Sequence, residues 1–119
     1  KPSDIGYINA HATATPIGDL SEIKAIKRIF GNDGGGIPVS STKGLTGHGL
    51  SLSSAMEAGF CCLVLHHGIL PGSANIDELD PGAKGLNILT ESVESKPDYV
   101  LTNSSGFGGA NVSVVLKRT

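Results

Sequence analysis

The sequence predicts an α/β domain in which helices pack on a mixed β-sheet. Short runs of β-branched and aliphatic residues alternate with two longer segments of helical character along the first 70 residues. The last third of the chain holds three further strand-like runs, which predicts that parallel and antiparallel neighbours share one sheet. A chain of 119 residues has room for one domain, which we expect to span 1–119. The strands are expected at 5–10, 37–41, 86–89, 99–103 and 111–116.

The first helix is expected over residues 16–30 and is amphipathic. Pro16 suits a first helical turn, and Gly31 is typical of a helix end. Apolar side chains recur at helical spacing on one face, and charged side chains occupy the other. The segment Asp19–Glu22 resembles a capping box. This pattern predicts a helix that lies on the surface of the domain.

The second helix is expected over residues 50–67 and is apolar on every face. Glu57 is its one Asp, Glu, Lys or Arg residue, and Cys61 and Cys62 lie among apolar neighbours, where buried thiols are inert. Such a helix is buried, and we expect a larger assembly around it. A buried carboxylate needs a partner, for which Lys43 is the candidate; the alternative is that Glu57 points to solvent.

Composition excludes several classes of function. A net charge of −2 lacks the basic surface expected of a nucleic-acid-binding domain. Two adjacent cysteines form neither an ordinary disulfide nor a zinc site, so we expect a reduced, cytoplasmic protein. Apolar runs stay below the roughly 20 residues of a membrane span. A start without Met and without a leader fits a processed product or a piece of a longer polypeptide.

Three loops at predicted strand ends carry the residues most suited to chemistry. The segment His11–Thr15 offers an imidazole and two hydroxyls, although it also fits a strand end with a capping Thr. Lys43–His48 precedes the apolar helix, and a plain turn is its alternative. Gly106–Gly109 exposes backbone N–H groups suited to an oxyanion hole, although a tight hairpin would use the same residues.

The order and spacing of three segments resemble the C-terminal half of the β-ketoacyl-acyl-carrier-protein synthase family. These segments are His11–Asp19, Ser41–His48 and Asn103–Asn111. Ala74–Asp80 and Gly85–Ile88 are similar to the synthase I type within that family. The resemblance covers nearly the whole chain, and it implies one half of a thiolase-like fold.

The resemblance also implies a decarboxylative Claisen condensation, in which an acyl-enzyme thioester accepts the carbanion formed from malonyl-acyl-carrier protein. It implies acyl-carrier protein, the N-terminal half of the enzyme and a second copy of the chain as partners. No cofactor is expected, because the phosphopantetheine arm belongs to the carrier protein. The implied catalytic residues are His11, His48 and Lys43; the supporting residues are Glu57 and Asp19; the substrate-binding residues are Thr13, Thr15, Phe107, Gly106 and Gly108.

Two departures from the family pattern bear on function. Ser105 stands where the family usually has a second aromatic residue, and neither cysteine occupies the position of the nucleophile. An alternative is therefore a non-catalytic chain-length factor or acyl-binding scaffold of the same fold, but a scaffold needs no pair of imidazoles. A thiolase is a third alternative, and it would place a reactive cysteine near Gly106, where this chain has none.

Overall fold

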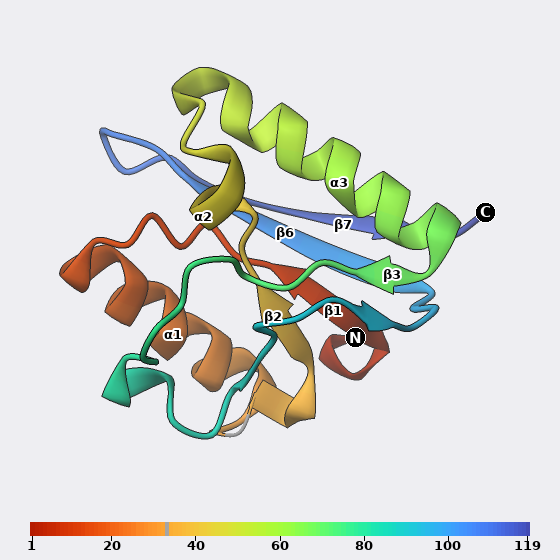
Figure 1. Ribbon diagram of the computed structural model, residues 1–119, viewed down its shortest axis with the longest axis horizontal. Coiled ribbons are helices and arrows are strands. Elements are labelled where there is room, and N and C mark those ends of the chain that lie inside the picture. The colour runs from red at the N-terminus through yellow and green to blue at the C-terminus, as the bar shows by residue number, and fades with distance from the viewer. Residues whose placement is uncertain (33) are drawn as a thin grey trace.

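A computed structural model describes residues 1–32 and 34–119, and it confirms an α/β fold with a mixed sheet (Figure 1). Most predicted elements are present, with shifted ends. The helices are α1 (Pro16–Phe30), α2 (Lys43–Thr46) and α3 (Ser53–His67), and 3-10 turns span Pro2–Asp4, Gly34–Gly36, Leu50–Leu52 and Pro81–Ala83. The strands are β1 (Ile5–Asn9), β2 (Pro38–Ser40), β3 (Ile69–Leu70), β4 (Asn87–Ile88), β5 (Val93–Glu94), β6 (Tyr99–Ser105) and β7 (Asn111–Lys117).

The main sheet has five strands in the order β4-β2-β1-β6-β7. The first four run parallel, and β7 pairs antiparallel with β6 through a hairpin. A parallel pair needs a crossover connection, which α1 supplies between β1 and β2. The sequence did not predict the antiparallel pair β3–β5, because strands of two residues are too short to show a period.

The sheet is covered on both faces (Figure 1). Helix α3 lies on one face, over β6 and β7, and α1 covers the other face together with a segment that we call the strap, residues 73–83. A bulge in β1 at Gly6 sends Tyr7 toward α3, while Ile5 and Ile8 both face α1. Two core clusters result, one on each side of the sheet.

The segment 42–67 differs from its prediction. Residues 43–46 form the short helix α2 instead of an open loop, and α3 begins at Ser53, because Leu50 has a left-handed φ of 53° and a 3-10 turn precedes the helix. One stripe of α3 is buried, but the outer face is exposed at Cys62 and Leu63. The expectation of two buried cysteines is therefore wrong for Cys62, and burial of the outer face by a larger assembly stays a prediction. No helix in the described part of the chain is long and apolar enough to cross a membrane.

A series of buried hydrogen bonds, which we call the buried chain, connects the central strands of the sheet. The hydroxyls of Tyr7 and Ser40 lie 2.7 Å apart, and Ser40 Oγ donates to the Pro71 carbonyl at 2.6 Å. Asn9 Nδ2 contacts the Tyr7 oxygen at 3.4 Å. Burial raises the pKa of Tyr7, so its hydroxyl stays neutral and available as a hydrogen-bonding group. This chain connects β1, β2 and the segment that leads to the strap.

We predict that Tyr7→Phe lowers the free energy of unfolding by about 1–2 kcal/mol, because it removes a buried hydrogen-bond partner. Tyr99→Phe is the matched control: Tyr99 is half-buried on β6, with the Lys117 ammonium 5.7 Å from its ring centre, and it should change stability by less than about 0.5 kcal/mol. Urea denaturation of both variants measures the difference. Equal effects of the two substitutions would contradict a structural role for the buried chain.

Candidate active site

The three loops with candidate residues meet at one edge of the sheet. Strands β1, β2 and β6 are mutually parallel, so their carboxyl ends lie on the same side. The loop after β1 carries His11, the segment after β2 carries Lys43 and His48, and the turn after β6 carries Phe107. Figure 1 shows this edge at the left of the view, where α2 and the β6–β7 turn lie above α1. The fold thus brings together residues that are up to 96 positions apart in sequence.

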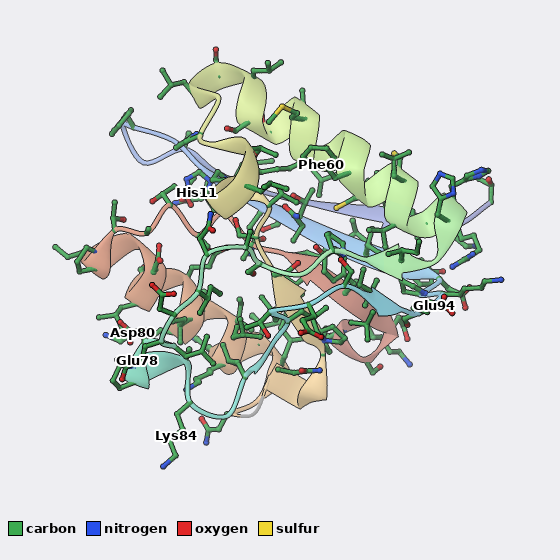
Figure 2. All side chains as sticks on the ribbon, viewed as in Figure 1. His11, Phe60, Glu78, Asp80, Lys84 and Glu94 are labelled. Carbon is green, nitrogen blue, oxygen red and sulfur yellow. The ribbon has the colours of Figure 1, made fainter. Side chains whose placement is uncertain are left out.

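The two predicted histidines face each other. The ring centres of His11 and His48 lie 5.4 Å apart, with the ring planes at 88°. Two imidazoles at this separation can direct N–H groups toward one shared oxygen atom. Figure 2 shows His11 beside α2, at the top of the loop that leaves β1.

Hydrogen bonds at Nδ1 of His48 determine which ring nitrogen carries the proton. The backbone N–H of Leu50 donates to His48 Nδ1 at 3.1 Å, so Nδ1 is an acceptor in the neutral ring. Ser53 Oγ lies 2.8 Å from the same nitrogen and accepts from Gly49 N–H at 2.8 Å, which leaves its own hydrogen for Nδ1. Neutral His48 is therefore protonated at Nε2 and acts as a hydrogen-bond donor there.

His11 has a different environment. Its Nδ1 atom is buried and has no hydrogen-bond partner among the described residues. Burial lowers the pKa of His11, and the positive charge of Lys43 lowers it further. Both effects keep the imidazole neutral at pH 7.

Lys43 and Glu57 form a buried ion pair between α2 and α3. Lys43 Nζ donates directly to Glu57 Oε1, and the two side chains are 5% and 1% exposed. This confirms the predicted partner of Glu57 and rules out the solvent-facing alternative. The other carboxylate oxygen, Glu57 Oε2, is buried without a partner among the described residues. The pair holds the start of α2, and with it the segment that leads to His48.

A second carboxylate holds the His11 loop, and the sequence prediction missed it. The Glu22 oxygens accept from the backbone N–H groups of His11 and Ala12, each at 2.9 Å. Asn103 Nδ2 also donates to Glu22 at 3.2 Å, and Ser113 Oγ donates to Asn103 Oδ1 at 2.8 Å. The capping-box interpretation was wrong, because the helix starts at Pro16 and Glu22 bonds outside the helix. The spacing of Asp19 and Glu22, one helical turn apart, was the sequence signal that could have indicated two carboxylates facing the same loop.

Asp19 lies one helical turn before Glu22 and faces the same loop. Burial raises the pKa of the Asp19 carboxyl above its ordinary value, and the charge of Glu22 raises it further, although the N–H groups of Thr15, Ala14 and Thr13 lower it in part. The hydroxyls of Thr13 and Thr15 lie 3.2 Å apart, closer than in an extended segment, because the intervening Ala14 has a left-handed φ. Ala12 and Ala14 take left-handed φ angles of 28° and 61°, an uncommon conformation that the two carboxylates stabilise.

The glycine-rich turn forms the hairpin between β6 and β7. Gly106 N–H donates to the Ala110 carbonyl at 2.7 Å, and Gly108 and Gly109 have left-handed φ angles of 82° and 87°. The hairpin alternative is therefore realised. It leaves the Phe107 side chain fully exposed beyond the sheet edge, so this residue is available to contact whatever approaches the site.

Neither cysteine lies in the loops that carry the candidate residues. Cys61 packs in the core against the sheet, and burial raises its pKa to about 12. A thiol with that pKa stays protonated and unreactive at neutral pH. Cys62 lies on the exposed outer face of α3.

We predict strong coupling between Lys43 and Glu57 in a double-mutant cycle. Lys43→Ala or Glu57→Ala should each lower the free energy of unfolding by about 3–5 kcal/mol, because each leaves a buried charge unpaired. The double variant should lower the free energy of unfolding by much less than the sum of the two single effects. Denaturant unfolding of all four proteins measures the coupling. The pair Arg118–Asp98, 3.8 Å apart with an exposed carboxylate and a half-buried guanidinium, is the control and should give a coupling energy under about 1 kcal/mol. Additive losses at positions 43 and 57 would show that the groups do not interact.

His11 should make stability depend on pH. Its pKa in the folded protein lies below the value of about 6.5 in the unfolded chain, so the unfolded state binds more protons near pH 6. The free energy of unfolding should fall as the pH drops below about 6.5. Urea unfolding at pH 5, 6, 7 and 8 should show less of this loss in His11→Gln, whereas the exposed control His66→Gln should behave as the wild type. Identical slopes for His11→Gln and the wild type would contradict the assignment.

Comparison with known proteins places these residues in a family. The profile of the beta-ketoacyl synthase C-terminal domain matches residues 1–77. The 3-oxoacyl-[acyl-carrier-protein] synthase 1 of Escherichia coli K12 is 44% identical over 114 residues, and that of Haemophilus influenzae is 46% identical over 116. Each alignment covers 96% of this chain, and the chain spans 28% of the length of each relative.

Solved structures agree with the sequence comparison. A beta-ketoacyl synthase from Burkholderia phymatum superposes with a TM-score of 0.92 at 33% identity, over 99% of this chain and 28% of that one. AntDE:AntF, a type II PKS acyl-carrier protein in complex with its ketosynthase, gives 0.94 at 31% identity, over 100% of this chain and 29% of that one. The expected thiolase-like architecture is confirmed. The chain belongs to the beta-ketoacyl synthase family and corresponds to its C-terminal domain.

Proposed function

We propose that this chain supplies the decarboxylation half of the active site of a 3-oxoacyl-acyl-carrier-protein synthase, an acyltransferase of fatty acid elongation. The facing pair His11–His48 carries this proposal, because the rings lie 5.4 Å apart and His48 presents a donor nitrogen. Two donors that converge on one oxygen suit a reaction in which negative charge develops on a thioester oxygen. The matching segments of the synthase relatives support it.

The proposed reaction starts from a malonyl thioester on acyl-carrier protein. The bond between the malonyl carboxylate and the adjacent carbon breaks, carbon dioxide leaves, and the electron pair forms an enolate. The thioester oxygen of the enolate accepts N–H bonds from His11 and His48, which stabilises the transition state more than the substrate. The enolate carbon then attacks the carbonyl carbon of an acyl-cysteine, and the cysteine thiolate leaves. We place that cysteine outside residues 1–119, because Cys61 is buried in the core and Cys62 lies on the outer face of α3.

The remaining candidate residues position the substrate in this proposal. Thr13 and Thr15 offer neighbouring hydroxyls to the phosphopantetheine arm of the carrier protein, so the chain needs no cofactor of its own. We propose that Phe107, which is fully exposed on the β6–β7 turn between Gly106 and Gly108, faces the acyl thioester and that its N–H donates to the thioester oxygen. Asp19 supports the threonine loop, and Lys43 with Glu57 fixes the segment before His48.

Partners follow from the same proposal. We propose acyl-carrier protein as the substrate carrier and a polypeptide segment with the acylated cysteine as the missing half. The exposed outer face of α3 supports a neighbour of that kind. Among the solved relatives, ApeO is a ketosynthase in complex with its chain length factor ApeC, which supports assembly of two similar subunits. We propose a homodimer in the cytoplasm.

A non-catalytic chain length factor is the second candidate, because the ishigamide ketosynthase/chain length factor superposes with a TM-score of 0.93 at 31% identity. The histidine pair favours the enzyme. A scaffold has no use for two facing imidazoles, of which His48 accepts a hydrogen bond at Nδ1 and His11 has a buried Nδ1 atom.

We predict that His11→Ala or His48→Ala in the complete protein raises the barrier to decarboxylation by about 2.7–4 kcal/mol, the effect of losing one preorganised oxyanion donor. Acyl transfer to the cysteine should remain near the wild-type rate. Release of labelled carbon dioxide and formation of acyl-enzyme measure the two half-reactions separately. His66→Ala, at the exposed end of α3, is the matched control and should change neither. Equal loss of both half-reactions would contradict a role confined to decarboxylation.

A further inference from the structure

A cavity of about 520 Å³ lies under the strap, between α1 and the carboxyl ends of β1 and β2. Its floor is apolar and belongs to the core cluster on the α1 side of the sheet. Neither histidine lines it, so the cavity is separate from the His11–His48 site. The floor is formed by Ile23, Ile26, Val39, Leu86 and Ile88.

The rim of this cavity is acidic. Asp19 and Glu22 line it from α1, and Asp77, Glu78 and Asp80 line it from the strap. Among the described residues that line the cavity, none is basic. The Lys27 ammonium reaches one end of the strap, but it donates to the carbonyls of Gly82 and Lys84 at 2.8 and 2.9 Å. Figure 2 shows Glu78 and Asp80 together beside α1, with Lys84 pointing away into solvent.

We propose that this cavity binds an amphipathic cation, a primary amine that carries an apolar chain. The apolar body would lie on the floor, and the ammonium would lie among the carboxylates of the rim. Charge complementarity selects this class of ligand: an anion would be repelled by five carboxylates, whereas an ammonium group would be attracted to them. The volume is within the usual range for small-molecule sites.

The walls of the cavity are the segments that hold both histidine loops. Glu22 lines the cavity and at the same time accepts the His11 and Ala12 N–H bonds. On the opposite wall, Asn75 has a left-handed φ of 60°, and its Nδ2 donates to the Gly44 carbonyl on α2 at 2.7 Å. An ammonium near Glu22 competes with the two backbone amides for the carboxylate. Ligand binding in the cavity should therefore loosen the His11 loop. An effect of the ligand on catalysis would follow only if the proposed function holds.

Calorimetric titration of the complete protein with octylammonium chloride tests the proposal, with sodium octanoate and ammonium chloride as matched probes. Octylammonium should bind at least tenfold more tightly than either. The double variant Asp77→Asn/Glu78→Gln should weaken octylammonium binding about fivefold, because both residues are exposed rim charges. Glu94→Gln is the control, because Glu94 is exposed and lies at the far end of the molecule in Figure 2. It should leave the affinity unchanged.

Hydrogen exchange provides a second readout that does not depend on catalysis. Saturating octylammonium should speed exchange of the His11 and Ala12 amides in the wild type, and octanoate at equal concentration should not. Octanoate binding equal to that of octylammonium, no octylammonium binding, or the same affinity in the wild type and the Asp77→Asn/Glu78→Gln variant would overturn the proposal. Because binding is measured without turnover, a failed decarboxylation assay would count against the proposed function and leave this result intact.

Discussion

The buried ion pair between Lys43 and Glu57 is the interaction on which the candidate site depends. Both charges lie out of solvent, so each is tolerable only in the presence of the other. Their pairing joins α2 to α3, and therefore joins the short segment with His48 to the buried face of α3. The same ammonium also acts on His11, whose pKa it lowers from across the site. Lys43 thus holds the segment before His48 through its ion pair and also favours the neutral form of His11.

The His11 loop is held by hydrogen bonds to its backbone instead of by an ion pair. The loop after β1 has no regular structure, and two of its alanines adopt left-handed backbone angles. Carboxylates on successive turns of α1 hold this loop through its backbone, and an amide from β6 in turn donates to one of them, Glu22. The helices are packed on the core of the sheet, and their polar side chains hold the loops in place. This division explains why the site occupies the carboxyl edge, where loops from distant parts of the sequence converge.

Much of the fold and of the site could be predicted from the sequence. The periodicity of α1 and the β-rich runs of β1, β6 and β7 gave elements that the structure confirms, because each is long enough to show a pattern. Glu57 could be matched with Lys43, since an isolated charge on an apolar helix demands a partner. The two-residue strands β3 and β5 and the one-turn helix α2 could not be predicted, because they depend on tertiary contacts. Glu22 was assigned a local role because its true partners, the amides of His11 and Ala12, lie outside its own helix.

The hydrogen bond from the Leu50 N–H to His48 Nδ1 limits the part that His48 can take in the proposed reaction. A ring that accepts at Nδ1 and carries its proton at Nε2 has no free lone pair to offer a substrate. His48 therefore cannot remove a proton from carbon while this contact is intact. In the proposed reaction the nucleophile arises by loss of a carboxylate group as carbon dioxide, a cleavage that does not need His48 as a base.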